Sequence, residues 1–221
     1  MASIKGMGSE ANLKCLIVGD IHGIYKPFRA DLERLNPDIV LATGDFGYFP
    51  RIKPFITEWK NNNIPIYFCE GNHDDIETLN QLNIHEVAEN IFYKKRGETI
   101  NLPDGRTVLF IGGAQSIDKY ARTEGCDYFP QEILTAGDYY RLDTSLKVDI
   151  VVSHTKPNYF DVRIPKIVQD PSEDVLDGVF DLYKPKQWFF SHWHKNALGT
   201  YKDCEWTLLN YYNNPGWYRW L

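Results

Sequence analysis

The chain has 221 residues, of which 43% are hydrophobic and 24% charged, and its formal net charge is −6. This length suits one α/β domain, and the composition is that of an ordinary globular protein. No stretch approaches the roughly 18 consecutive apolar residues that a membrane span needs. The lack of a basic run argues against an extended contact with nucleic acid.

The N-terminus and the cysteines bear on where the protein works. Residues 1–12 show neither an apolar core nor a small-residue cleavage pattern, so we expect a flexible extension there and a single domain over residues 13–221. The four cysteines form no CxxC pair, which argues against a zinc finger and against a disulfide framework. We therefore expect a reducing, cytoplasmic environment.

The N-terminal half repeats one pattern, in which an apolar run of β-forming residues ends in a polar cluster. The pattern occurs at residues 13–23, 38–47 and 64–74. Apolar residues at helical spacing lie between these runs, at residues 26–35 and 51–62. Alternation of this kind predicts βαβ units with a parallel sheet, whose carboxyl ends are where ligands gather. All three polar clusters fall at such ends.

The C-terminal half continues with a predicted hairpin over residues 96–113, closed by a Pro-Asp-Gly turn. Helices are expected over residues 130–142 and over residues 172–185, the second of them ended by Pro185. Two more strands, within residues 148–154 and 186–194, end in histidine. The tail after residue 197 predicts short antiparallel strands, and its aromatic stretch 210–220 is expected to form a face of the second sheet, as core or as an oligomer interface.

Histidines gather at the ends of the apolar runs. Of the six in the chain, five directly follow such a run: His22, His73, His154, His192 and His194. One such histidine alone is more often a core or loop residue than a ligand. Five in the same context, joined at strand ends by Asp20, Asp45 and Asn72, are difficult to explain as independent accidents. His85 lies in a polar helical region and is expected at the surface.

Oxygen and imidazole ligands suit Mn²⁺, Fe or Zn²⁺ rather than a soft thiolate-bound metal. Seven ligands are too many for one ion and suit two ions that share a carboxylate. Two carboxylates against two divalent ions leave a positive site, which would attract a phosphate anion.

Five short motifs carry a family resemblance. The stretches GDIHG (19–23), GD (44–45), GNHD (71–74), SH (153–154) and SHWH (191–194) resemble, in order, the motifs of the calcineurin-like metallophosphoesterases. The resemblance implies a four-layer α-β-β-α sandwich of two mixed sheets flanked by helices. It also implies two divalent ions, Mn²⁺ first, with Fe, Zn, Ni or Co as alternatives, and hydrolysis of a phosphate ester by metal-bound hydroxide.

The resemblance assigns roles to individual residues. It implies that one ion is held by Asp20, His22, Asp45 and His194, and that Asp45 bridges to a second ion completed by Asn72, His154 and His192. His73 would not be a ligand but would protonate the leaving oxygen or stabilise charge on the phosphoryl group. Asp74 would orient His73 through its other ring nitrogen.

Two departures from the family pattern bear on the substrate. Many members, especially protein phosphatases, follow the second Asp with an Asp-Arg-Gly turn, whereas this chain reads GDFGYFP, which weakens a protein-phosphatase interpretation. Ser191 stands where a Gly is usual, which removes no ligand.

Substrate contacts are expected from residues 112–122, whose Gly pair follows a predicted strand. Asp118, Lys119 and Arg122 would lie near the strand ends, where Arg122 could bind a phosphate or a neighbouring acid. The alternative is a solvated loop with a structural Arg–Asp pair. Tyr25, Tyr48 and Phe49 could stack on a base, although core packing is the preferred interpretation.

Three functions compete. The first is a phosphodiesterase acting on nucleotides or nucleic-acid ends, and the alternative is a phosphomonoesterase. The third is a non-catalytic scaffold of the same fold, which is disfavoured because all seven ligand positions and His73 are filled. The sequence offers no protein partner and leaves the oligomeric state open.

Overall fold

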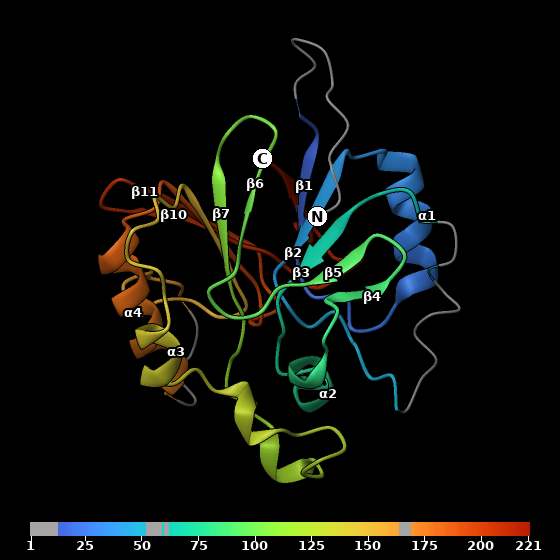
Figure 1. Ribbon diagram of the computed structural model, residues 1–221, viewed down its shortest axis with the longest axis horizontal. Helices are drawn as coiled ribbons and strands as arrows, with labels where there is room; N and C mark the ends of the chain where they lie inside the picture. Colours follow the sequence, from blue (N-terminus) through green and yellow to red (C-terminus); the bar gives the residue numbers. More distant parts are fainter. Residues whose placement is uncertain (1–12, 52–58, 60–61, 164–168) are drawn as a thin grey trace.

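The computed structural model describes residues 13–51, 59, 62–163 and 169–221. Two six-stranded sheets pack face to face between layers of helix (Figure 1). The expected N-terminal extension lies outside the described residues, and so does most of the helix expected over residues 51–62. The four-layer sandwich with two mixed sheets is confirmed.

The first sheet is built from the repeated βα pattern of the N-terminal half. In spatial order its strands are β12 (Tyr218–Trp220), β1 (Cys15–Val18), β2 (Ile39–Ala42), β3 (Ile66–Phe68), β5 (Ile91–Tyr93) and β4 (Glu86–Ala88). The four central strands are parallel, and the two edge strands run antiparallel to their neighbours. The parallel arrangement places the carboxyl ends of β1, β2 and β3 at one edge of the sheet.

The second sheet repeats this design. Its strands, in spatial order, are β10 (Ala197–Tyr201), β11 (Cys204–Leu208), β9 (Gln187–Phe190), β8 (Ile150–Ser153), β7 (Thr107–Ile111) and β6 (Thr99–Asn101). The central four are parallel, with antiparallel strands at both edges. The expected hairpin over residues 96–113 is the β6–β7 pair.

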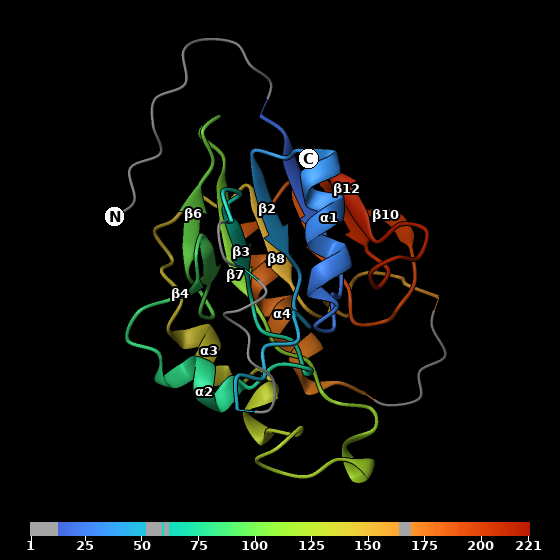
Figure 2. The same cartoon turned by 90° about the vertical axis from the view of Figure 1, so that its right-hand side faces the viewer.

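Helices cover the outer faces of both sheets. The α-helices are α1 (Tyr25–Leu35), α2 (Ile76–Gln81), α3 (Ala136–Tyr140) and α4 (Pro171–Tyr183), and two 3₁₀ turns are η2 (Lys119–Ala121) and η3 (Pro130–Glu132). Figure 2 shows α1 along the outer face of the first sheet, and α3 and α4 cover the second sheet on the other side (Figure 1). No helix within the described ranges is both long enough and apolar enough to cross a bilayer.

Alternating side chains of the strands separate three apolar layers. Leu16 and Val18 of β1 belong to the cluster under α1, whereas Ile17 between them belongs to the cluster between the two sheets, together with Phe110 of β7. Because successive strand residues point to opposite faces, a strand buried on both sides must be apolar throughout. This is why the strands of the N-terminal half appear in the sequence as uninterrupted apolar runs.

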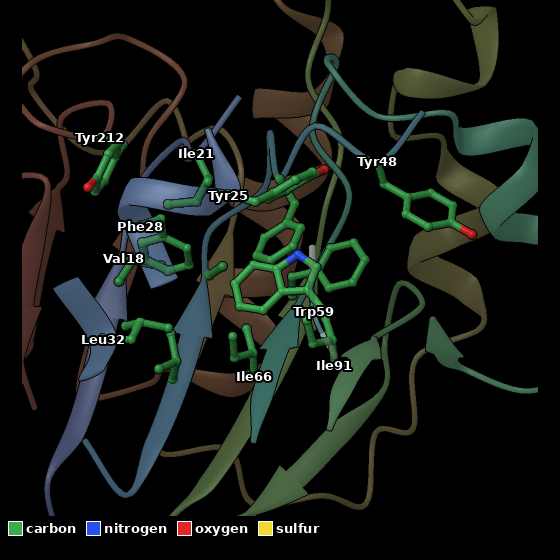
Figure 3. Packing of buried hydrophobic residues seen from close by; sticks show 14 of the residues in the cluster. Val18, Ile21, Tyr25, Phe28, Leu32, Tyr48, Trp59, Ile66, Ile91 and Tyr212 are labelled. Carbon is green, nitrogen blue, oxygen red and sulfur yellow. The ribbon is translucent and has the colours of Figure 1, made fainter. Parts of the chain in front are cut away.

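Aromatic side chains fill the cluster under α1 (Figure 3). Phe28 lies 6.1 Å from Trp59, measured between ring centroids. Tyr25 and Tyr48 are buried in the same cluster. The preferred interpretation of these two tyrosines, core packing, is therefore confirmed.

Three expectations about local structure were wrong in detail. The helix expected over residues 130–142 is split, because Thr135 and Asp138 form a capping box that starts α3 anew after the extended residue Ile133. The last helix begins earlier than expected, at Pro171, and is capped by Asp170. In the tail, β10 and β11 form the expected antiparallel pair, but β11 is also parallel to β9.

The aromatic tail also lies elsewhere than expected. Strand β12 pairs with β1 at the edge of the first sheet, not of the second. Tyr212 and Trp217 of this stretch are buried in the cluster under α1. These two residues are therefore core, whereas Tyr211 and Trp220 of the same stretch are exposed.

The cysteines differ sharply in accessibility. All four are free, and only Cys126 is exposed. Burial raises the pKa of the Cys15 thiol to about 12, and that of Cys204 likewise to about 12.

We expect one thiol per native chain to react with Ellman's reagent at pH 8, and four after denaturation in guanidinium, because the thiolate is the reacting species. Rapid reaction of a second native thiol would contradict this packing.

Candidate metal centre

The predicted ligands come from the carboxyl ends of five parallel strands. Asp20 and His22 follow β1, Asp45 follows β2, and Asn72 follows β3 in the first sheet. The second sheet contributes the histidines that follow β8 and β9, namely His154, His192 and His194. The two sheets thus deliver their polar ends to one place.

Four of the predicted ligands form one close group of side chains. The ligand atoms of Asp20, His22, Asp45 and His194 all lie within 4.8 Å of one another. His194 Nε2 lies 3.3 Å from Asp20 Oδ2, and His22 Nε2 lies 3.7 Å from Asp45 Oδ2. Two carboxylates and two imidazoles form a donor set that suits a divalent transition metal.

A second group adjoins the first through Asp45. His154 Nε2 lies 3.2 Å from Asp45 Oδ1 and 3.0 Å from Asn72 Oδ1. The other nitrogen of this ring, Nδ1, donates to the carbonyl oxygen of Thr43 at 2.9 Å, which fixes the ring with Nε2 toward the centre. Asp45 therefore presents one carboxylate oxygen to each group.

The two histidines of the second group differ in their tendency to bind a proton. Burial opposes charge on His154, but the carboxylates of Asp45 and Asp20 outweigh it and raise its pKa to about 10. Burial lowers the pKa of His192 to about 3, so this ring is neutral. Its Nε2 atom is buried without a hydrogen-bond partner among the described residues. A neutral imidazole nitrogen without a hydrogen bond can give its lone pair to a metal ion, and the carboxylates beside it would balance the charge of that ion. The residues therefore fit a metal ion.

The backbone at the centre is held in an uncommon conformation. His22, Asp45, His192 and His194 all have positive φ angles, of 48°, 45°, 67° and 47°. Left-handed backbone in non-glycine residues carries strain and concentrates at functional sites. The four residues share this feature although they come from three different loops.

Two glycines of the motifs provide space for ligands. A Cβ atom at Gly44 would lie 2.6 Å from His154 Nδ1, and one at Gly71 would lie 2.1 Å from Asp45 Oδ1. Both separations are shorter than van der Waals contact, so a side chain at either position would displace a ligand. The motifs GD and GNHD therefore need glycine first for close packing.

His73 lies beside the centre, paired with Arg122. The His22 and His73 rings meet edge to face with their centroids 4.7 Å apart, and Arg122 Nη2 lies 2.7 Å from His73 Nε2. Because a guanidinium only donates, Nε2 must be the accepting nitrogen. Burial lowers the pKa of His73, Asp45 opposes this, and Arg122 lowers it further. Arg122 also donates to the Asn72 carbonyl oxygen at 3.0 Å and pairs with Asp118 at 2.7 Å.

Asp74 differs from expectation, because its hydrogen bonds run to the backbone. Its two oxygens accept the amide N–H groups of Gly47, Tyr48 and Gly71, each at 2.8 Å. Among the described residues no hydrogen bond joins it to His73, whose ring nitrogen is paired with Arg122. Asp74 thus ties together the loops that carry Asp45 and Asn72.

We expect Asp74→Ala to lower the free energy of unfolding by about 2–4 kcal/mol, because it leaves three N–H donors without their buried acceptor. Urea unfolding of the metal-free protein measures this. Asp104→Ala, at an exposed turn, is the control. A change below about 0.5 kcal/mol, typical of surface sites, would contradict the bridging role.

The remaining predicted residues lie at the rim or outside the centre. Asp118 is exposed and bound to Arg122, while the Lys119 ammonium lies 5.4 Å from the centroid of the Tyr120 ring. His85 is half-buried and pairs with Glu98 at 3.3 Å. Sequence reasoning missed two buried residues that adjoin the centre, Ser116 and Glu132. The only sequence signal for Ser116 is its place just after the Gly pair 112–113, and no motif marks Glu132.

Comparison with known proteins identifies the family. Residues 13–196 match the family model described as calcineurin-like phosphoesterase. The chain belongs to this family. Its members are hydrolases of phosphate esters, and this phosphoesterase retains their ordered motifs. None of the curated protein sequences matches the chain.

Solved structures with the same fold are distant in sequence. Phosphopantetheinyl hydrolase (PptH) from Mycobacterium tuberculosis is 13% identical, with a TM-score of 0.51 over 94% of this chain and 95% of that one. GAP50 of Plasmodium, described as the anchor in the inner membrane complex, is 14% identical, with a TM-score of 0.52 over 89% and 70% of the two chains. At this identity the comparison establishes the fold of the phosphoesterase and leaves its substrate to be argued from the site.

Proposed function

We propose that this phosphoesterase hydrolyses phosphodiesters, in nucleotides or at nucleic-acid ends, at a centre of two divalent ions. The observation that carries the proposal is the pair of ligand groups that share Asp45. When bound, two ions such as Mn²⁺ would activate a water molecule and neutralise charge on the phosphoryl oxygens.

The ligand residues would divide between the two ions. Asp20, His22 and His194 would hold one ion with Asp45, and Asn72, His154 and His192 would hold the other with the same carboxylate. Asp20, Asp45 and His154 are buried, which strengthens their electrostatic interactions and limits the access of bulk water.

His73 and Arg122 would act on the substrate. Arg122 donates to His73 Nε2 in the free protein, and an incoming phosphate competes for the guanidinium because it is a stronger, charged acceptor. Once Arg122 turns to the phosphate, His73 Nε2 loses the hydrogen bond that occupies its lone pair, so it can take up a proton from water and pass that proton to the leaving oxygen.

The charge beside His73 favours a diester over a monoester. Asp118 pairs with Arg122 at 2.7 Å, so the cation placed against His73 is already neutralised. A diester carries one negative charge and a monoester close to two. Because the Arg122–Asp118 pair adds little net positive charge beside His73, this side of the centre suits the diester. A phosphomonoesterase remains the alternative function.

The first experiment compares bis-p-nitrophenyl phosphate with p-nitrophenyl phosphate, using metal-stripped protein reloaded with Mn²⁺. We expect a higher kcat/KM for the diester. A preference for the monoester would replace the proposal by a phosphatase. No turnover of either substrate with two ions bound would instead favour the non-catalytic scaffold.

We expect Arg122→Gln to lower kcat/KM for the diester by about 10- to 100-fold, the loss of one charge-assisted hydrogen bond of about 1.5–3 kcal/mol. Bound Mn²⁺ should stay unchanged, since Arg122 is outside both ligand groups. Arg106→Gln removes an arginine that pairs with Asp104 at an exposed turn and serves as the control. Equal kcat/KM in the two variants would show that Arg122 does not contact the phosphate.

A further inference from the structure

The side chain of Asn72 can serve the centre in only one of its two orientations. Its carbonyl oxygen has lone pairs for a cation, whereas its NH₂ group has only protons to offer. In the structure Oδ1 faces the centre, 3.0 Å from His154 Nε2. Nδ2 points away from it and donates to Ser116 Oγ at 3.3 Å. A rotation of the amide by half a turn would aim protons at the cation.

The Ser116 hydroxyl is polarised by Glu132. Ser116 Oγ donates to Glu132 Oε2 at 2.8 Å, and the Ser116 amide donates to Oε1 at 2.5 Å. Burial raises the pKa of Glu132 to about 7, so above that pH the ionised carboxylate only accepts and the single hydroxyl proton is directed to it. The hydroxyl oxygen is then left as an acceptor, which selects the NH₂ end of the Asn72 amide.

Glu132 is held firmly in this position. Arg96 donates to the backbone carbonyl oxygens of Gln131 and Glu132 at 2.8 and 3.2 Å, and its Nε donates to Glu70 Oε1 at 2.6 Å. Glu70 precedes the Gly71-Asn72 pair in the chain. Arg96 therefore anchors both the peptide that carries Glu132 and the strand end that carries Asn72.

A purely structural role explains Glu132 poorly. Its side chain is completely buried, yet within the described residues it forms no ion pair, and both of its oxygens are used on Ser116. A buried carboxylate without a cation carries a large desolvation cost, and an apolar side chain would fill the space at lower cost. What a carboxylate provides, and an apolar residue does not, is the direction of the hydrogen bonds.

We propose that Ser116 and Glu132 are positioning residues that hold the Asn72 carbonyl oxygen toward the second divalent ion. The inference rests on the proposed two-ion function, because it assigns a purpose to the orientation of one ligand. Neither residue contacts the reacting atoms. Both act through Asn72.

The decisive variant is Glu132→Gln, which keeps the size of the side chain. A glutamine can donate to Ser116 Oγ, so the hydroxyl proton becomes free to turn to Asn72 and the amide can rotate. We expect titration calorimetry with Mn²⁺ to show the weaker of the two binding events reduced by about 10- to 100-fold, as for other outer-shell partners. The stronger event should be unchanged. Glu124→Gln, exposed in the same loop, is the matched control.

A double-mutant cycle separates orientation from general destabilisation. Asn72→Asp presents an oxygen whichever way it turns, so in that background Glu132→Gln should change the weaker Mn²⁺ affinity by no more than about twofold. Ser116→Ala should behave like Glu132→Gln in both backgrounds and provides the same test if Glu132→Gln fails to fold, which circular dichroism would reveal.

Each result has one meaning. If Glu132→Gln weakens Mn²⁺ binding when residue 72 is asparagine but not when it is aspartate, the inference is supported. Wild-type affinity in Glu132→Gln, or equal losses in both backgrounds, overturns it while leaving the two-ion centre intact. Fewer than two Mn²⁺ ions bound by the wild-type protein would overturn the proposed function and the inference together.

Discussion

Asp45→Asn should abolish hydrolysis of bis-p-nitrophenyl phosphate and reduce bound Mn²⁺ to at most one ion per chain. Asp45 presents Oδ2 to His22 Nε2 and Oδ1 to His154 Nε2, so one of its oxygens faces each ligand group. Asp20 lies 3.7 Å from His154 only at Nδ1, the nitrogen that is turned to the Thr43 carbonyl. Loss of an outer-shell partner costs about 10- to 100-fold in affinity or activity, and loss of a shared ligand should exceed that range. Metal analysis after dialysis and steady-state kinetics measure the two effects.

The matched control is Asp203→Asn, which removes a carboxylate that is 92% exposed. It should keep wild-type activity and metal content. Two ions bound to Asp45→Asn with wild-type affinity would contradict the shared role of this carboxylate. A protein that binds metal normally but turns over no substrate would place Asp45 in the chemistry rather than in the ligand set.

His73→Ala should lower kcat by about 10²- to 10⁴-fold, the usual contribution of a general acid, while leaving bound Mn²⁺ unchanged. His73 lies against the His22 ring and Arg122 rather than among the four clustered ligands. Because p-nitrophenolate leaves without a proton and an alkoxide does not, the loss should be greater on a thymidine dinucleotide than on bis-p-nitrophenyl phosphate. This difference between the substrates identifies the proton donor.

His85→Ala is the control, since His85 pairs with Glu98 away from the ligand groups. Near-wild-type turnover of both substrates by His73→Ala would show that His73 does not act in catalysis. A fall in bound Mn²⁺ would show instead that it contributes to the ligand set.

The fold was predictable because its main features are local in the sequence. Apolar runs such as residues 13–18 indicate strands buried on both faces, and helical spacing between the runs indicates crossovers, which together predict parallel sheets. The spacing of apolar residues does not show where a capping motif ends one helix and starts another. The capping box of Thr135 and Asp138 restarts a helix inside an otherwise periodic segment, and this interrupted the helix expected over residues 130–142.

The sequence by itself determined which side chains reach the centre. Asp20, Asp45, Asn72, His154 and His192 all follow apolar runs, and parallel strands bring such ends to one edge. Only the tertiary structure decided how the neighbours of these residues pair: Arg122 with His73, Asp74 with backbone amides, and Glu132 with Ser116. The physical reason is that a strand and the polar residues at its carboxyl end are neighbours in the sequence. The partner of a buried polar group, in contrast, comes from a loop that is distant in the chain.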